Sequence, residues 1–319
     1  MLENVTNFAI WMVVGFVAIL TIFCNLYILL MNLGSYHKNH HFQPSEIIIT
    51  VLSVTNIVYQ ILTYLWMTMD LLSVTCLIDC LFNTLIMLLI NSLRCTLVWT
   101  TAFLSFFYST KLVIEPIHCY TKIQEGILKH APTVLLVIVF FSFASCFPAM
   151  LVLSRNNQTG SYDCSTMISN ETPGLIYVGF YTAISVIIPG LIMMKSSISI
   201  TVHLAIHMYH MKANTNGFHG PKLGSEMRVI RMIMALVVVY LFFLIADLVV
   251  LYRSTINRDN LSYTTGLVSS IYTSTSSFIL IYGKKAHWKE LILIYNQFVG
   301  EYPCIRCMRC PEKKVSPPH

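Results

Sequence analysis

The amino-acid sequence predicts an all-α fold, a bundle of seven transmembrane helices with the N-terminus outside the membrane. Hydrophobic residues make up 56% of the 319 residues and charged residues only 11%, and the mean hydropathy is +0.69. A soluble domain carries about 25% charged residues. Apolar stretches of about 20 residues, enough to cross a hydrocarbon core of about 30 Å, recur along the chain. Because lipid supplies no hydrogen-bond partners and barrel strands have only about 10 residues, these stretches are expected to be helices.

Seven apolar segments satisfy this criterion, and in chain order they are 8–32, 45–69, 80–110, 132–153, 175–206, 229–251 and 261–282. The first is expected to remain as a helix rather than to be cleaved as a signal peptide, because it is long and its flank, MLENVTN, has no positive charge. The seventh has the weakest hydropathy signal, since its stretch SSIYTSTSSFILI is rich in hydroxyl groups. Its assignment therefore depends on the distribution of charge.

Basic residues are divided very unequally between the two sides of this topology. Fifteen of them are predicted to be cytoplasmic: Lys38, Lys111, Lys122, Lys129, Lys212, Lys222, Arg228, Arg231, Lys284, Lys285, Lys289, Arg306, Arg309, Lys313 and Lys314. Only Arg155, Arg253 and Arg258 are predicted to be outside. This positive-inside asymmetry requires the seventh span, because six spans would export the basic tail. Topology thus explains the net charge of +6. The sequence has no basic patch interleaved with aromatic residues, so it does not predict nucleic-acid binding.

The segments between the helices are short, so the sequence predicts one transmembrane domain over residues 1–303 and a short cytoplasmic tail over residues 304–319. Four Asn-X-Ser/Thr sequons begin at Asn4, Asn157, Asn170 and Asn260. All four fall in segments that the charge distribution places outside. We expect glycosylation at Asn157 and Asn170, which share the longer outer loop.

The ten cysteines do not form a disulfide framework, because most lie in predicted helices, where a small apolar thiol packs well. A bridge from Cys76 or Cys80 to Cys164 in the second outer loop remains open. The tail motif CIRCMRC, with Cys304, Cys307 and Cys310, has three interpretations: acylation, a metal-binding knuckle or unmodified thiols. Its basic, juxtamembrane position favours acylation.

Catalytic motifs are absent from the sequence, which has no glycine-rich phosphate loop, no HExxH, no GxSxG and no carboxylate pair at helical spacing. The sequence therefore predicts neither an enzyme nor a cofactor or resident metal. Three charged residues inside the spans are more informative, since a charge at bilayer depth costs about 3 kcal/mol on insertion scales. Arg94 and Asp247 are predicted at similar depth, and both an ion pair and a ligand contact remain open. Lys195 is expected to snorkel or to bond a carbonyl.

Other polar groups and prolines in the spans predict how the helices pack. Pro132, Pro148 and Pro189 free backbone carbonyls and predict bends in the fourth and fifth helices. Asn25, Asn56 and the hydroxyl-rich run 272–277 are expected to form interhelical hydrogen bonds, each contributing about 1 kcal/mol or less.

The stretch LSFFYSTKLVIEPIH, residues 104–118, resembles the inner end of the third helix in the bitter taste receptor family, where an LS-x-FY-x-x-K-I pattern precedes a short cytoplasmic segment. Lys111 would then mark the cytoplasmic border. Further stretches resemble the family in the same order: CNLYI with Asn25, LSVTN with Asn56, HLAIHMYHMKAN at 203–214, GFHGPKLGSEMRVIRMI at 217–233 and SSFILIYGKK at 276–285. The resemblance covers nearly the whole chain.

This resemblance implies a G-protein-coupled receptor of the plasma membrane that binds small bitter ligands and activates a heterotrimeric G protein. It places the ligand in the outer half of the bundle, between helices three, five, six and seven. The implied pocket residues are Arg94, Ile90, Phe243 and Asp247. The implied G-protein-coupling residues are Lys111, His207, His210, Lys212, Arg228 and Arg231.

The chain also departs from the family pattern, and two other functions remain open. Asn56 stands where mammalian members usually carry Arg, and Thr273 and Ser276 stand where they usually carry Pro and His. These departures indicate a divergent member and raise the hypothesis of a non-mammalian one. One alternative is a vomeronasal-type pheromone receptor, whose third-helix and loop signatures we do not find. The other is a small-solute transporter using the intramembrane charges, although no internal repeat or pair of broken helices is visible.

Overall fold

A computed structural model describes residues 2–72, 80–112, 122, 126, 129–148, 172–214, 224–257 and 262–301. The regular structure in these ranges is helical. The helices are α1 (Leu2–Asn39), α2 (Pro44–Leu71), α3 (Cys80–Leu112), α5 (Ala131–Cys146), α7 (Thr172–Thr182), α8 (Ile188–Asn214), α9 (Gly224–Asn257), α10 (Ser262–Gly283) and α11 (Lys285–Glu301). A π-helical segment, η2 (Ala183–Ile187), joins α7 to α8 without a break.

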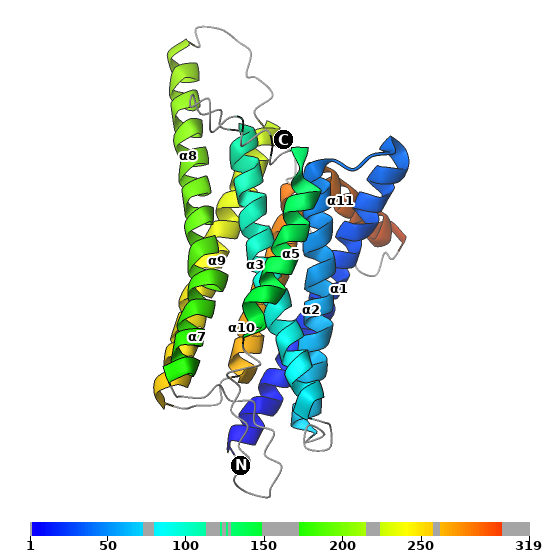
Figure 1. Ribbon diagram of the computed structural model, residues 1–319. Helices are drawn as coiled ribbons and strands as arrows, with labels where there is room; N and C mark the ends of the chain where they lie inside the picture. Colours follow the sequence, from blue (N-terminus) through cyan, green and yellow to red (C-terminus); the bar gives the residue numbers. More distant parts are fainter. Residues whose placement is uncertain are drawn as a thin grey trace, which may run out of the picture.

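The long helices pack side by side in one bundle and alternate in direction, as Figure 1 shows. We name the two ends of the bundle by their connections. The α2–α3 end is where α2 ends and α3 begins, and the α1–α2 end is where α1 ends and α2 begins. The last helix, α11, lies at the α1–α2 end (Figure 1). Helix α3 is central and contacts α2, α5 and α8.

Five helical stretches are long and apolar enough to cross a membrane: Val5–Lys38, Pro44–Leu71, Phe82–Lys111, Ile176–Ile206 and Met227–Arg253. They coincide with the first, second, third, fifth and sixth predicted segments. Helix α5 is apolar but has only 16 residues, and α10 has 22 residues with many hydroxyl groups. The structure therefore shows an all-helical protein with five candidate spans, and the seven-span topology stays a prediction. Helix α11 lies beyond the seven predicted segments.

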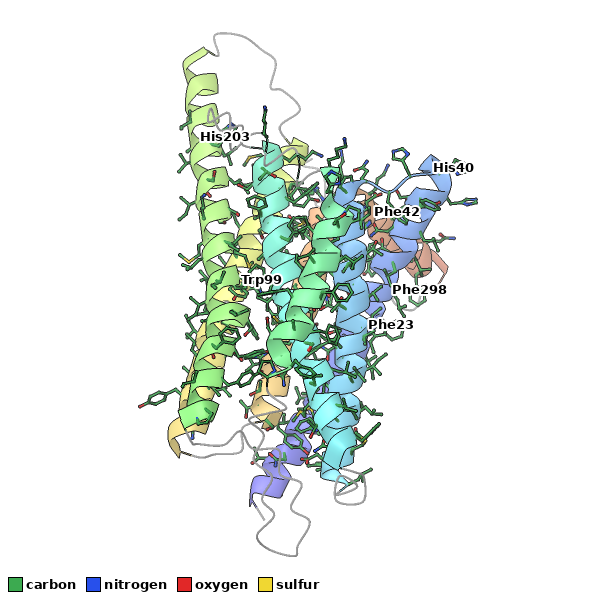
Figure 2. All side chains as sticks on the ribbon, viewed as in Figure 1. Phe23, His40, Phe42, Trp99, His203 and Phe298 are labelled. Carbon is green, nitrogen blue, oxygen red and sulfur yellow. The ribbon has the colours of Figure 1, made fainter. Side chains whose placement is uncertain are left out.

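The distribution of side chains is the reverse of that in a soluble domain. Large apolar side chains cover the outer surface, with Phe23 67% and Phe140 68% exposed, and Figure 2 shows Phe23 on the outside of the bundle. Polar side chains such as Asn25, Asn56 and Gln60 are buried between the helices. A continuous apolar surface of this kind indicates an interaction with a membrane.

The buried polar side chains form a seam between α1, α2 and α10. Asn25 Nδ2 donates to Ser277 Oγ at 2.8 Å, and Asn56 Nδ2 lies 3.4 Å from both Asn25 Oδ1 and Ser277 Oγ. One turn along α2, Gln60 Nε2 donates to Thr273 Oγ1 at 2.6 Å. The predicted interhelical hydrogen bonds of Asn25, Asn56 and the 272–277 run are thus confirmed.

At the α1–α2 end, an ion pair joins α2 to the residue between α10 and α11. Lys284 Nζ lies 2.9 Å from Glu46 Oε1 and 3.0 Å from Asn32 Oδ1. Ser35 Oγ donates to Glu46 Oε1 at 3.1 Å, and the Gln43 backbone N–H donates to Glu46 Oε2 at 3.2 Å. The last contact also stabilises the start of α2, because it satisfies a backbone donor that the helix itself leaves free. We call these five residues the Glu46 cluster.

The first turn of α11 packs against this cluster. Tyr27 OH on α1 donates to the His287 carbonyl oxygen at 2.6 Å. The His287 side chain is buried, and burial together with the neighbouring positive charge of Lys284 lowers its pKa from 6.5 to about 4, against the opposing effect of Glu46. The imidazole is therefore neutral at physiological pH.

Candidate binding site

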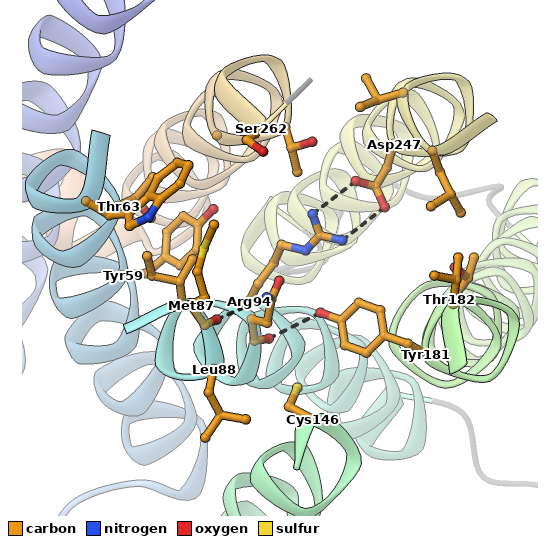
Figure 3. Close-up of a pocket in the computed structure, with 18 of the residues that line it drawn as sticks. Tyr59, Thr63, Met87, Leu88, Arg94, Cys146, Tyr181, Thr182, Asp247 and Ser262 are labelled. Atoms are coloured by element: carbon orange, nitrogen blue, oxygen red, sulfur yellow. Dashed lines mark hydrogen bonds and ion pairs between the residues drawn. The ribbon is translucent and has the colours of Figure 1, made fainter. Parts of the chain in front are cut away.

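A cavity of about 290 Å³ lies in the half of the bundle next to the α2–α3 end. Helices α2, α3, α7, α9 and α10 all contribute side chains to its wall, and Cys146 closes it from α5. Figure 3 shows the Arg94 and Asp247 side chains pointing toward each other and joined by two interactions, with Tyr59 and Thr63 on the other side of Arg94. The wall therefore combines one charged pair with aromatic and hydroxyl groups.

Arg94 on α3 and Asp247 on α9 form a two-point ion pair. The guanidinium nitrogens Nη1 and Nη2 lie 3.1 and 3.2 Å from the two carboxylate oxygens, and the side chains are only 12% and 8% exposed. Parallel bonds of this type hold both position and orientation. The guanidinium carbon also lies 6.0 Å from the centre of the Tyr181 ring, within reach of a cation–π interaction. Of the two interpretations that the sequence left open, the structure shows the ion pair, and a ligand contact of either residue stays a prediction.

Helical spacing decides which predicted pocket residues reach the cavity. Ile90 and Arg94 are four residues apart, so they share a face of α3, and both line the cavity. Phe243 is one turn deeper than Asp247 and is not among the lining residues. Its ring stacks on Tyr272 with the centroids 4.7 Å apart. The role of Phe243 in ligand binding stays a prediction, and the structure places it beneath the cavity.

The wall formed by α2 is absent from the sequence-based prediction, which placed the pocket between helices three, five, six and seven. Tyr59, Thr63 and Trp66 of α2 line the cavity, at spacings of three and four residues that put them on one face. Their spacing is visible in the sequence. However, buried aromatic and threonine side chains at this spacing are as typical of packing as of binding.

The π-helical segment η2 lies directly below the cavity and connects three helices. A π-turn leaves backbone carbonyls without their usual intrahelical partners. Trp99 Nε1 on α3 donates to the Ile184 carbonyl at 3.1 Å, and Tyr240 OH on α9 donates to the Val186 carbonyl. Tyr240 fits there because Gly190 has no side chain, and a Cβ at that position would lie 3.0 Å from Tyr240 Cε1. The proline two residues after η2 indicated a bend but not this bulge.

The predicted G-protein-coupling residues lie at the α1–α2 end. Lys111 near the end of α3 and Arg231 near the start of α9 are exposed. Arg228 lies over the Tyr282 ring, 5.7 Å from its centre. His207, His210 and Lys212 belong to the last turns of α8, but their side chains are outside the described part of the structure.

Several other predictions fall on residues that the structure does not describe. These are Asn157, Asn170, Cys76, Cys164 and the tail cysteines. Among the residues that are described, no group of three or more His, Cys, Asp or Glu side chains is arranged to hold a metal ion.

Comparison with known proteins identifies the family. A family model described as Taste receptor protein (TAS2R) matches residues 1–295. Taste receptor type 2 member 39 of Homo sapiens is 23% identical over 291 residues, covering 88% of this chain and 85% of the relative. The Macaca mulatta protein of that name is 25% identical over 285 residues, covering 85% and 82%.

The low identity over most of the chain agrees with the predicted divergent member. The family match also decides against the vomeronasal and transporter alternatives, and the family is one of receptors rather than enzymes. Because the matched region spans nearly the whole bundle, the chain belongs to the taste receptor type 2 family, the bitter taste receptors that couple to G proteins.

Proposed function

We propose that the cavity described above is the bitter-ligand site of this receptor and that Arg94, Ile90 and Asp247 contact the ligand, with Phe243 beneath it. The observation that carries this proposal is the ion pair, which lies in the cavity wall and joins α3 to α9. A ligand in contact with the pair also contacts both helices. It therefore has different contact energies in different helix arrangements, which is the requirement for shifting their equilibrium.

The size and lining of the cavity support a small organic ligand. Its volume of about 290 Å³ is just below the range of about 300–1,000 Å³ found for small-molecule sites. Trp66, Tyr177 and Tyr181 offer aromatic faces, and the ion pair offers a polar end. A panel of bitter compounds, with calcium release as the readout, tests the proposal. No response to any compound, from receptor present at the cell surface, would contradict it.

We further propose the complete topology: seven spans over a receptor domain of residues 1–303, the N-terminus outside, and residues 304–319 as a cytoplasmic tail at the plasma membrane. The fifteen-to-three distribution of basic residues supports it. In this topology the cavity is in the outer half of the bundle. Protease digestion of sealed, right-side-out vesicles tests it with an epitope on the tail, and cleavage of the tail from outside would refute it.

Glycosylation at Asn157 and Asn170 belongs to the same topology, because both sequons fall in the second outer loop. Removal of N-glycans with a glycosidase should increase the gel mobility of the receptor. Asn157→Gln and Asn170→Gln should each remove part of that shift. A receptor whose mobility never changes would count against this assignment.

We propose that the heterotrimeric G protein binds at the α1–α2 end, through Lys111, His207, His210, Lys212, Arg228 and Arg231. These positions lie at the ends of α3 and α8 and the start of α9, which Figure 1 shows at the same end of the bundle. Reversing Arg228 and Arg231 to Glu should lower signalling at unchanged surface expression. The matched control reverses Lys285 and Lys289, two exposed lysines of α11. An equal loss in the control would mean that only total charge matters.

A further inference from the structure

The Arg94–Asp247 pair presents both of its charges to the same cavity. Arg94 on α3 and Asp247 on α9 both line the wall, and their side chains are 12% and 8% exposed. Figure 3 shows the two charged ends meeting in the space that the helices around the cavity enclose. A ligand in the cavity therefore meets a positive and a negative group that lie side by side.

Neither group exhausts its hydrogen-bonding capacity in this pair. Each Asp247 oxygen accepts one bond from Arg94, at 3.1 and 3.2 Å, although a carboxylate oxygen has more than one lone pair. The guanidinium uses Nη1 and Nη2 for Asp247, and its planar fork carries further N–H groups. Both residues therefore have the chemistry to bond a ligand group of the opposite charge.

Arg94 also has a support that does not depend on Asp247. Its guanidinium carbon lies 6.0 Å from the centre of the Tyr181 ring on α7, and an aromatic face attracts a cation within about 6 Å. The Tyr181 hydroxyl donates to the Asn91 carbonyl at 3.3 Å, and the Tyr181 ring stacks on Tyr177 with the centroids 6.1 Å apart. Arg94 keeps this contact when Asp247 bonds to a ligand, so the pair can open while the guanidinium stays in the wall.

The two opposite charges decide which charges a ligand can carry. An anion that takes Arg94 leaves the Asp247 carboxylate buried without a partner, and a cation that takes Asp247 does the same to the guanidinium. An uncharged ligand avoids this cost but brings no charge of its own to either side. A zwitterion can bond to both residues, its carboxylate to Arg94 and its ammonium to Asp247. Every charge in the site then keeps a partner.

An α-amino acid matches the spacing of the pair and the rest of the wall. A single carbon atom separates its two charged groups, so they can reach two residues whose own charged atoms are 3.1 Å apart. Aromatic side chains also line the cavity, Tyr59 and Trp66 from α2 and Tyr177 from α7, and they favour an aromatic ligand side chain. The cavity volume of about 290 Å³ favours a single amino acid over a longer peptide.

We infer that this site takes a zwitterionic ligand, an α-amino acid with an aromatic side chain, whose carboxylate bonds to Arg94 and whose ammonium bonds to Asp247. The inference rests on the proposed role of the cavity as the ligand site, and it names the class of ligand. Arg94 and Asp247 then act together, as one recognition site for two opposite charges.

The test measures the Kd of four probes for the full-length receptor in lipid nanodiscs, with empty nanodiscs correcting for partition into lipid. The probes share one aromatic body. L-Phenylalanine carries both charges, hydrocinnamate lacks the ammonium, phenethylamine lacks the carboxylate, and hydrocinnamamide carries no charge. The ratios of Kd between probes are compared within one receptor preparation, so a smaller folded fraction in a variant does not change them.

The main variant combines Arg94→Gln with Asp247→Asn, which removes both charges and leaves neither of them uncompensated. The two single variants separate the contacts of the carboxylate and the ammonium. The matched control combines Glu46→Gln with Lys284→Gln, which neutralises the other interhelical ion pair, whose residues do not line the cavity.

We expect the wild-type receptor to bind L-phenylalanine at least about tenfold more tightly than each of the other probes, a difference of about 1.4 kcal/mol. The double variant should bind L-phenylalanine and hydrocinnamamide within about twofold of each other. Asp247→Asn should abolish the preference over hydrocinnamate, and Arg94→Gln the preference over phenethylamine. The control should keep the wild-type ratios.

The inference is overturned if a probe with one charge or none binds the wild type as tightly as L-phenylalanine, if the double variant keeps the preference, or if the control loses it. Absence of saturable L-phenylalanine binding at millimolar concentration also overturns it. Calcium release distinguishes this result from the proposed function. A receptor that signals to panel compounds but lacks the binding preference would refute this inference alone, whereas one that shows the preference but never signals would refute the proposed function alone.

Discussion

The two ends of the bundle each contain a buried interhelical ion pair, and the pairs differ in what surrounds them. Glu46 accepts hydrogen bonds from Lys284, Ser35 and the Gln43 backbone, so its position is fixed by three residues at once. The hydrogen bonds to the Asp247 side chain in the described structure come from Arg94, and both residues face a cavity. The difference indicates two roles. The Glu46 cluster is a closed connection between helices, whereas the Arg94–Asp247 pair faces the cavity that we propose as the ligand site.

The largest expected effect is the loss of the Glu46–Lys284 pair. Lys284→Ala removes the charge that compensates Glu46, and breaking a buried pair in this way costs about 3–5 kcal/mol. Because the Lys284 side chain is 25% exposed, we expect a value near the lower end. Thermal unfolding of the detergent-solubilised receptor measures the effect. Lys285→Ala, at the exposed neighbouring position, is the control, and an equal loss in both variants would contradict this role of the pair.

At the cavity, breaking the pair should change ligand preference as well as stability, because the residue left unpaired lies in the cavity wall. Asp247→Asn leaves Arg94 unpaired and should improve the potency of anionic agonists at least about tenfold relative to neutral ones, or about 1.4 kcal/mol. Arg94→Asn should instead favour neutral and cationic agonists. Dose responses for matched anionic, neutral and cationic compounds measure this at controlled surface expression. If potency falls equally for all three classes, Arg94 is structural and its pocket assignment is wrong.

A smaller effect is expected at the π-bulge between the two ends. Tyr240→Phe removes the hydrogen bond to the Val186 carbonyl and should destabilise the contact between α9 and η2 by about 1 kcal/mol. With α9 held less firmly, we expect higher signalling without ligand. Calcium release in unstimulated cells measures this, with the exposed Tyr252→Phe as control. Unchanged basal signalling in Tyr240→Phe would exclude the bulge as a restraint on α9.

The smallest effect concerns pH at the α1–α2 end. The His287 pKa is lowered from 6.5 to about 4 in the folded receptor, so the unfolded chain binds more protons between these values. Stability contributed by His287 is therefore complete above pH 6.5 and is lost as the pH falls toward 4. His287→Phe should reduce the loss of thermal stability between pH 7 and pH 5. A pH dependence identical to that of the wild type would refute this assignment.

The sequence predicted these two regions unequally well. An ion pair of Arg94 and Asp247 could be named as one of two alternatives, because charges at bilayer depth are rare and theirs fall at similar depth. The Asn25–Asn56–Ser277 contacts followed from the same reasoning. The depth of the cavity along α9 could not be fixed as securely. Phe243 is on the same face as Asp247 but one turn deeper, and the cavity wall includes Asp247 without reaching Phe243.

Two further features could not be predicted because their residues have ordinary alternatives. The sequence of η2 is that of a continuous apolar helix. The side chains that bond its carbonyls, Trp99 and Tyr240, come from α3 and α9, so the local sequence does not indicate a π-turn. The α2 wall of the cavity could not be told from a packing face, because buried aromatic and threonine side chains three and four residues apart are common between packed helices. Local sequence thus identified the intramembrane charges and the polar residues between helices. The π-turn and the cavity wall depend on side chains from helices that are distant in the sequence.

The seam between α1, α2 and α10 has a consequence for the biosynthesis of the receptor. Helix α10 is too rich in hydroxyl groups to enter a bilayer readily alone, and Ser277 finds its partner in Asn25, 252 residues earlier in the chain. In the proposed topology, its stable insertion therefore requires that α1 and α2 are already in the membrane and available. A substitution that removes Asn25 should therefore affect a late step of membrane insertion. We expect incomplete integration of α10 and retention of the new receptor inside the cell.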